Sequence, residues 1–276
     1  MKQIRITNIE NHISLFNNQN NLFNDIKWVE PIFISMTSAY NQNVEYLLET
    51  NNRYLYNMLT SEYKFCKTFS PISKITTRNG LEAISTQLTN VMLKNFTHLK
   101  STDIVDLKQY LQYLFLELMN NVADHAQADG HVMTQYYPIN KKVQFAIADK
   151  GVGFLSNLQL KFPDMKTEGE AILKALEKGI TATPQKMYGH EKNAGYGLYA
   201  MLEILKQTNG RFVIISNDTL VRFEDNQYTT KELAYKWEGV VIAFEFDEAN
   251  IEFDMDYFKR NYLWNEILDD DDEDFF

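Results

Sequence analysis

Five polar side chains interrupt an otherwise apolar segment, and their spacing could support ligand chemistry. Residues 115–126 read FLELMNNVADHA. On a helix, Glu117, Asn121 and His125 follow one another at intervals of four residues along one stripe, and Asp124 lies one step beside them. The stripe borders the apolar face of the same helix, where a polar group without a partner costs several kcal/mol. Hydrogen bonds to a neighbouring loop or a bound ligand must therefore satisfy these groups.

Two glycine motifs further along the chain favour the ligand. In ADKGVGF, Asp149 is followed by Gly151 and Gly153, which permit unusual backbone torsions and close approach to a ligand. A carboxylate at this position can accept a hydrogen bond from an exocyclic amine such as that of adenine. In GYGLY, Gly195 and Gly197 precede a helix whose free N–H groups and dipole favour phosphate. Each motif alone is weak evidence, whereas the three in this order form a strong combined signal.

The segments around these motifs have patterns typical of regular structure. Val143, Phe145 and Ile147 alternate with other residues as in a half-buried strand that ends at Asp149. A long and partly helical loop follows, and Gly210 stops the helix that begins after the second glycine motif. The expected helices include 80–93, 104–125 and part of 168–179, and the expected closing strands are 211–216 and 238–246.

The three motifs, E-x-x-x-N, D-x-G-x-G and G-x-G, resemble those of a known family. From about residue 100 to residue 246 the chain is similar to the ATP-binding domain shared by gyrase, the large heat-shock ATPases, histidine kinases and MutL, the GHKL superfamily. The resemblance implies the α+β class. It also implies a two-layer α/β sandwich of the Bergerat type, with helices on one face of a mixed sheet.

The resemblance assigns roles to the motif residues. It implies that Asn121 holds Mg²⁺, that Glu117 prepares the attacking water, and that Asp149 binds adenine. It also implies that Gly151 and Gly153 shape the pocket and that Gly195 and Gly197 lie at the phosphates. Beyond the boxes themselves, we expect Asp124 to assist through water near the adenine side, and Asn193, which adjoins the glycine turn, and Leu198 to contribute to nucleotide binding. His125 is more often a structural histidine with satisfied hydrogen bonds.

The sequence also departs from the family pattern. The closing strand of the fold often begins Gly-Thr, but here Gly239 is followed by Val240, so Thr181, Thr183 or water must replace the threonine. Histidine kinases carry a phosphorylated histidine in a context like S-H-E-L-R, and NHISL and THLKS upstream of the ATP module do not match it. The chain is also shorter than the gyrase and MutL class requires.

The flanking regions are expected to be separate units. Residues 1–75 vaguely resemble a small α/β module of the STAS type, with SPISK at 70–74 as a hinge; the alternative is an extension that packs on the sheet. Residues 247–276 carry twelve acidic and two basic residues, and so account for the whole formal charge of −10. This tail is a solvated end or a docking segment for a basic partner.

Composition limits the class of protein. With 276 residues, 45% of them hydrophobic, the chain can bury a sizeable core. We expect no membrane span and no export, because no long apolar run or signal core is present. The single cysteine, Cys66, fits a reducing cytoplasm. No basic stripe with interleaved aromatic residues predicts direct nucleic-acid binding, and a homodimer stays open.

These observations predict a cytoplasmic Mg-ATP-binding protein of the GHKL type. Its expected activity is slow ATP hydrolysis, in which closure of a lid over about 155–194 switches a partner protein. Two alternatives remain: a serine/threonine kinase resembling the anti-sigma-factor kinases, and a regulatory subunit that senses nucleotide without hydrolysing it.

Overall fold

A five-stranded sheet organises the molecule. The computed structural model describes residues 2–17, 26–40, 68–94, 96, 101–180 and 197–248, without the side chains of 101–103. In the described part the strand order is β3-β4-β5-β7-β6, and a two-stranded parallel pair, β1-β2, stands beside this sheet. In chain order the elements are β1 (Lys2–Ile4), the turns η1 (Ile9–Asn11) and η2 (Ile13–Asn17), β2 (Ile26–Val29), α1 (Pro31–Ala39), β3 (Ser73–Ile75), α4 (Leu81–Leu93), α5 (Ser101–Asn121), the π-helical turn η4 (Val122–Ala126), β4 (Gly130–Tyr137), β5 (Lys142–Asp149), α6 (Phe154–Leu158), α7 (Glu168–Ala175), α8 (Gly197–Gln207), β6 (Arg211–Glu224) and β7 (Gln227–Asp247).

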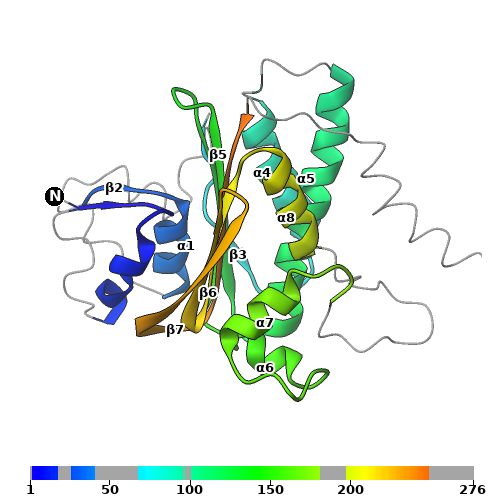
Figure 1. Ribbon diagram of the computed structural model, residues 1–276. Helices are drawn as coiled ribbons and strands as arrows, with labels where there is room; N and C mark the ends of the chain where they lie inside the picture. Colours follow the sequence, from blue (N-terminus) through cyan, green and yellow to red (C-terminus); the bar gives the residue numbers. More distant parts are fainter. Residues whose placement is uncertain are drawn as a thin grey trace, which may run out of the picture.

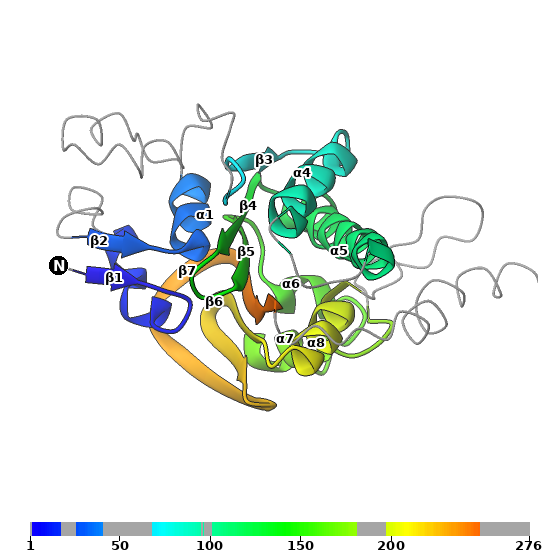
Figure 2. The same ribbon diagram turned by 90° about the horizontal axis from the view of Figure 1, so that it is seen from above.

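The expected α+β class, with helices packed on a sheet, is confirmed. Helices α4, α5 and α8 cover one face, and α1 with the N-terminal strands lies on the other (Figures 1 and 2). Every pairing in the five-stranded sheet is antiparallel, so the expectation of a mixed sheet is wrong. The second covered face adds a third layer to the expected sandwich.

Strand β5 shows why the second face is covered. Val143, Phe145 and Ile147 point toward the helical layer, as their alternation predicts. The expectation of a half-buried strand is nevertheless wrong, because Ala146 and Ala148 on the other face are also buried, against α1. Their small side chains let α1 approach closely, and the Ser35 hydroxyl donates a hydrogen bond to the Ala146 carbonyl at 3.1 Å.

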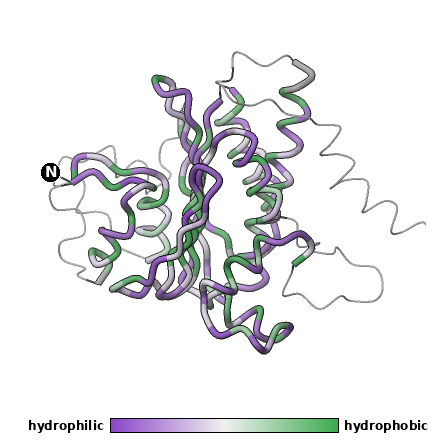
Figure 3. The backbone as a smooth tube through the Cα atoms, in the orientation of Figure 1, coloured by the Kyte–Doolittle hydropathy of each residue, from purple (hydrophilic) through white to green (hydrophobic). Residues whose placement is uncertain are grey.

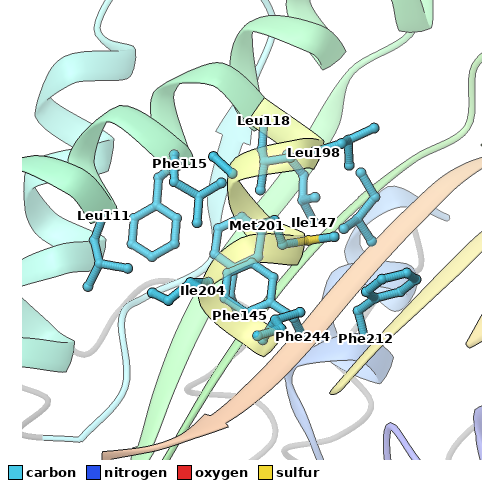
Figure 4. Close-up of a cluster of buried hydrophobic side chains, with 14 of the residues drawn as sticks. Leu111, Phe115, Leu118, Phe145, Ile147, Leu198, Met201, Ile204, Phe212 and Phe244 are labelled. Carbon is cyan, nitrogen blue, oxygen red and sulfur yellow. The ribbon is translucent and has the colours of Figure 1, made fainter. Parts of the chain in front are cut away.

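The core between the sheet and the helices is rich in aromatic and aliphatic side chains. Phe145 stacks between Phe115 of α5 and Phe244 of β7, with ring centroids 4.8 and 4.9 Å away. Leucine and methionine side chains of α5 and α8 close around this stack (Figure 4). Hydrophobic segments accordingly run along the sheet and along the helices that cover it (Figure 3). No helix in the described part of the chain combines the length and apolarity that crossing a membrane requires.

Strands β6 and β7 form a long hairpin. Its two-residue turn, Asp225 and Asn226, has both φ angles positive, as a tight turn between twisted strands requires. The β6–β7 register is irregular around Ser216 and Asn217, where extra residues of β7 are accommodated. The expected strand over 238–246 is therefore the inner part of a much longer one.

The N-terminal region packs on the sheet. Residues 68–75 run along β4, with the Ser70 N–H donating to the Thr134 carbonyl at 2.9 Å, and Ser73–Ile75 form the edge strand β3 where SPISK was expected to be a hinge. The described residues of 2–40 bury apolar side chains against the sheet. The STAS resemblance stays a prediction. Residues 41–67 lie outside the described part, as does the tail beyond residue 248.

Candidate functional site

An open cavity lies beside the helical layer, and its empty space, which includes open solvent, amounts to about 770 Å³. It is bounded by α5 and η4, the start of α8, the end of β5, Val240 and Ile242 within β7, and residues between Val152 and Ile180. Its lining is mostly apolar, and it also contains five polar residues: Glu117, Asn121, His125, Asp149 and Asn157. An apolar cavity with a few convergent polar groups is the usual form of a ligand site.

The predicted polar stripe faces this cavity. Glu117, Asn121 and His125 all line it, and Glu117 is only 8% exposed. Asp124 points elsewhere: its carboxylate pairs with Arg78, through Oδ1 to Nε at 2.9 Å and Oδ2 to Nη2 at 2.6 Å. Asp124 is not among the residues that line the cavity, so three of the four stripe residues come together there.

The helix changes its winding where the stripe ends. The expected α-helix stops at Asn121 and continues as the π-helical turn η4, after which Gln127 takes a left-handed conformation with φ of 59°. Such single turns of π-helix are frequent at functional sites. The Ala126 carbonyl accepts a hydrogen bond from the Val152 N–H at 2.9 Å. This bond joins the end of the helix to the loop after Asp149.

The two glycines of D-x-G-x-G are required by close packing against protein atoms. A Cβ on Gly151 would overlap the Ala126 carbonyl, and a Cβ on Gly153 would overlap the side chains of Glu168 and Asn217. Neither glycine is among the residues that line the cavity. The two glycines therefore affect the shape of the cavity only indirectly, because they let the loop pack closely against η4 and β6.

A buried carboxylate that sequence reasoning missed anchors this loop. Glu168, 8% exposed, accepts hydrogen bonds from the Ser216 hydroxyl at 2.6 Å, the Asn217 amide at 2.5 Å and the Leu155 N–H at 3.1 Å. Sequence pattern gives no signal for it, because its partners lie on a strand far along the chain. The capping box of Thr167 and Glu170 fixes the start of α7 beside it.

Asp149 is held at the back of the cavity. It is 2% exposed, and its Oδ1 accepts hydrogen bonds from the N–H groups of Gly151 at 2.9 Å and Val240 at 3.2 Å. Its Oδ2 makes no hydrogen bond to any residue that the structure describes. Burial raises the pKa of Asp149 to about 6, against the opposing effect of the two N–H donors.

The main chain of Asp149 is also held. Its carbonyl accepts a hydrogen bond from Trp237 Nε1 at 3.0 Å. Gly239, with φ of 110°, lies so close to this carbonyl that a Cβ would overlap it. Sequence reasoning noted Gly239 but missed Trp237, which belongs to none of the three motifs although its side chain contacts Asp149.

The phosphate side of the expected site is described in part. Gly197 and Leu198 begin α8 and line the cavity, and a Cβ on Gly197 would stand 2.8 Å from the Cβ of Glu117. Asn193 and Gly195 lie outside the described residues, as do Thr181 and Thr183. Their predicted roles stay predictions.

His125 and Asn157 complete the polar lining. Burial is the main cause of the lowered pKa of His125, which favours the neutral ring at neutral pH. Asn157, which sequence reasoning missed, donates to the carbonyls of His125 at 3.4 Å and Gly153 at 3.3 Å. The first of these bonds ties α6 to η4.

Within the described ranges no three His, Cys, Asp or Glu side chains gather as a metal site. Mg²⁺ needs no such cage, because it keeps several waters and takes phosphate oxygens as ligands. The Asn121 side chain, which lines the cavity one turn after Glu117, could supply one oxygen.

The comparisons with known proteins add no family to this description. No family model matches the sequence, and no curated protein matches it.

Proposed function

We propose that this cavity binds Mg-ATP and that the protein hydrolyses it slowly. The observation that carries the proposal is the carboxylate of Asp149. Two main-chain donors hold its Oδ1 in an apolar cavity that also contains Glu117 and Asn121. Its second oxygen is an acceptor suited to an amine of a planar, largely apolar ligand such as adenine.

The opposite side of the cavity suits the phosphates. The N-terminus of α8 lies against Glu117, and a helix N-terminus favours phosphate oxygens. With ATP in this orientation, Asn121 contributes an amide oxygen to Mg²⁺, which neutralises phosphate charge. Glu117 orients a water and accepts its proton as the water oxygen attacks the γ-phosphorus. The bond from the γ-phosphorus to the bridging oxygen then breaks, and ADP leaves with that oxygen.

We place this activity in the cytoplasm and assign it a switching role. Closure of the segment over about 155–194 around ATP changes a surface that a partner protein reads, and hydrolysis resets it. The acidic tail would engage a partner with a basic surface. Glu117 acts equally well on the hydroxyl of a partner's serine or threonine, so the fate of the phosphate decides between hydrolase and kinase.

The test follows γ-labelled phosphate from ATP with wild-type protein and with Glu117→Gln, each with and without Mg²⁺. Glu203→Gln on α8, which removes a carboxylate paired with Lys206 at 2.9 Å, is the matched control. We expect Mg²⁺-dependent release of free phosphate that Glu117→Gln abolishes and Glu203→Gln retains. Label transferred to protein would assign a kinase instead. Release that Glu117→Gln leaves unchanged would refute the proposal.

A further inference from the structure

A short segment within β7, from Trp237 to Val240, holds Asp149 through contacts that are not part of the regular strand pairing. The β5–β7 pairing ends at Ala148 and Val241, one residue before Asp149. Beyond that pair, the Asp149 carbonyl accepts from the side chain of Trp237, and its Oδ1 accepts from the Val240 N–H. The backbone and the carboxylate of one residue are therefore fixed from the same short segment of β7.

The N-terminal layer packs directly on Trp237. The indole is 1% exposed, and it meets the ring of Phe16 edge-on with centroids 5.2 Å apart. The ring of Tyr40, at the end of α1, lies 6.4 Å away. Both aromatic partners come from a part of the chain that carries none of the three motifs.

Trp237 and Tyr40 also contact Lys150, the residue after Asp149. Lys150 Nζ lies 4.6 Å from the ring centroid of Trp237 and 5.0 Å from that of Tyr40, on the side of the sheet away from the cavity. Such cation–π contacts strengthen when the cation is partly desolvated, as it is here, where burial lowers the Lys150 pKa. Its other charged neighbours are Glu238, at 3.9 Å, Asp149 and Lys236.

We propose that Trp237 is a positioning residue for Asp149, and that Tyr40 and Phe16 act on base recognition through it. The inference rests on the proposed ATP site. Asp149 can accept a hydrogen bond from the amine of the base only if its Oδ2 is correctly positioned. That position depends on the hydrogen bond that Trp237 donates to the Asp149 carbonyl. The N-terminal layer is then a regulatory part of the site: a change in how it packs alters base recognition on the opposite face of the sheet.

Trp237→Phe tests the anchor, since it keeps an aromatic ring against Phe16 and Lys150 but removes the Nε1 donor. Trp28→Phe, at a half-buried tryptophan of β2, is the matched control. The measurement is the affinity for ATP and for inosine triphosphate, whose base carries an oxygen where adenine carries the amine. We expect Trp237→Phe to weaken ATP binding about tenfold with little change for inosine triphosphate, and Trp28→Phe to change neither.

A second variant guards against a folding defect in the first. Tyr40→Leu removes the aromatic ring that contacts Lys150 and Trp237, and Tyr40→Phe is its control. We expect Tyr40→Leu to reduce the preference for ATP over inosine triphosphate, but by less than Trp237→Phe does. If the variants weaken both nucleotides equally, or weaken neither, Trp237 is a packing residue and the inference is overturned. Wild-type protein that binds neither nucleotide would instead refute the proposed function, and the inference with it.

Discussion

Gly197 at the start of α8 lies against Glu117 of α5 so closely that a Cβ on the glycine would stand 2.8 Å from the glutamate Cβ. A side chain there must push the two helices apart, because real Cβ atoms essentially never approach so closely. The G-x-G motif therefore brings the N-terminus of α8 beside the proposed catalytic carboxylate.

Gly197→Ala should reduce ATP turnover, because it displaces the start of α8 from Glu117. We expect the free energy of unfolding to fall by about 1–3 kcal/mol, the usual cost of overpacking. Gly169→Ala in α7 is the control, since its Cβ would meet only Thr230 Cγ2, at 3.1 Å, and Thr219 Cγ2, at 3.6 Å. Phosphate release and chemical denaturation measure both effects, and unchanged turnover in Gly197→Ala would contradict the phosphate-side geometry.

Gly151→Ala should destabilise the fold more than Gly80→Ala. At Gly151 the Cβ overlaps the Ala126 carbonyl, which is rigid main chain and accepts the Val152 hydrogen bond. Gly80 has φ of 82° but open space around its Cα, so alanine there costs only the backbone strain of about 1–2 kcal/mol. Urea denaturation of the two variants compares them directly. Equal or reversed losses would mean that the loop after Asp149 is not tightly packed on η4.

Protonation of the Asp149 carboxylate should increase the free energy of unfolding as the pH falls from about 7 toward 4. Its folded pKa of about 6 exceeds its ordinary value of 3.8, so the folded state binds the proton more tightly than the unfolded chain. The cost of burying the charge is present above pH 6 and is relieved below it, by up to about 3 kcal/mol. Asp149→Asn should lack this contribution. Parallel pH profiles for wild type and variant would argue against the raised pKa.

Asp124 should contribute less to ATP affinity than its position beside the polar stripe suggests. Its carboxylate pairs with Arg78, and both side chains are partly exposed, so the pair should stabilise the fold by about 1 kcal/mol or less. Asp124→Asn should leave ATP affinity within about twofold of wild type, since its carboxylate is turned away from the cavity. Calorimetric titration checks this, and a large loss of affinity would restore the role expected from the sequence.

Local patterns predicted the parts of the site that local chemistry determines. The i, i+4 spacing placed Glu117, Asn121 and His125 on one stripe, and the alternation in β5 placed Asp149 at a strand end. Both placements agree with the structure. Helix periodicity could not anticipate the π-helical turn, because its single wide turn has no sequence signature.

Contacts between distant segments could not be predicted. Glu168 with Ser216, and Trp237 with Asp149, join residues 48 and 88 positions apart, and no spacing rule relates such pairs. The pattern of β5 could not show for the same reason that both of its faces are buried. Ala146 and Ala148 are small residues that suit either solvent or close packing, and only the position of α1 decides between them.

Titration of ATP into wild-type protein and Asp149→Asn tests the central claim most directly. In the variant the Asn oxygen can still accept from the N–H groups of Gly151 and Val240, so the fold should persist while the second position becomes a donor. We predict that ATP binding is lost although the circular dichroism spectrum is unchanged. ATP affinity equal to that of the wild type in the folded variant would contradict the account.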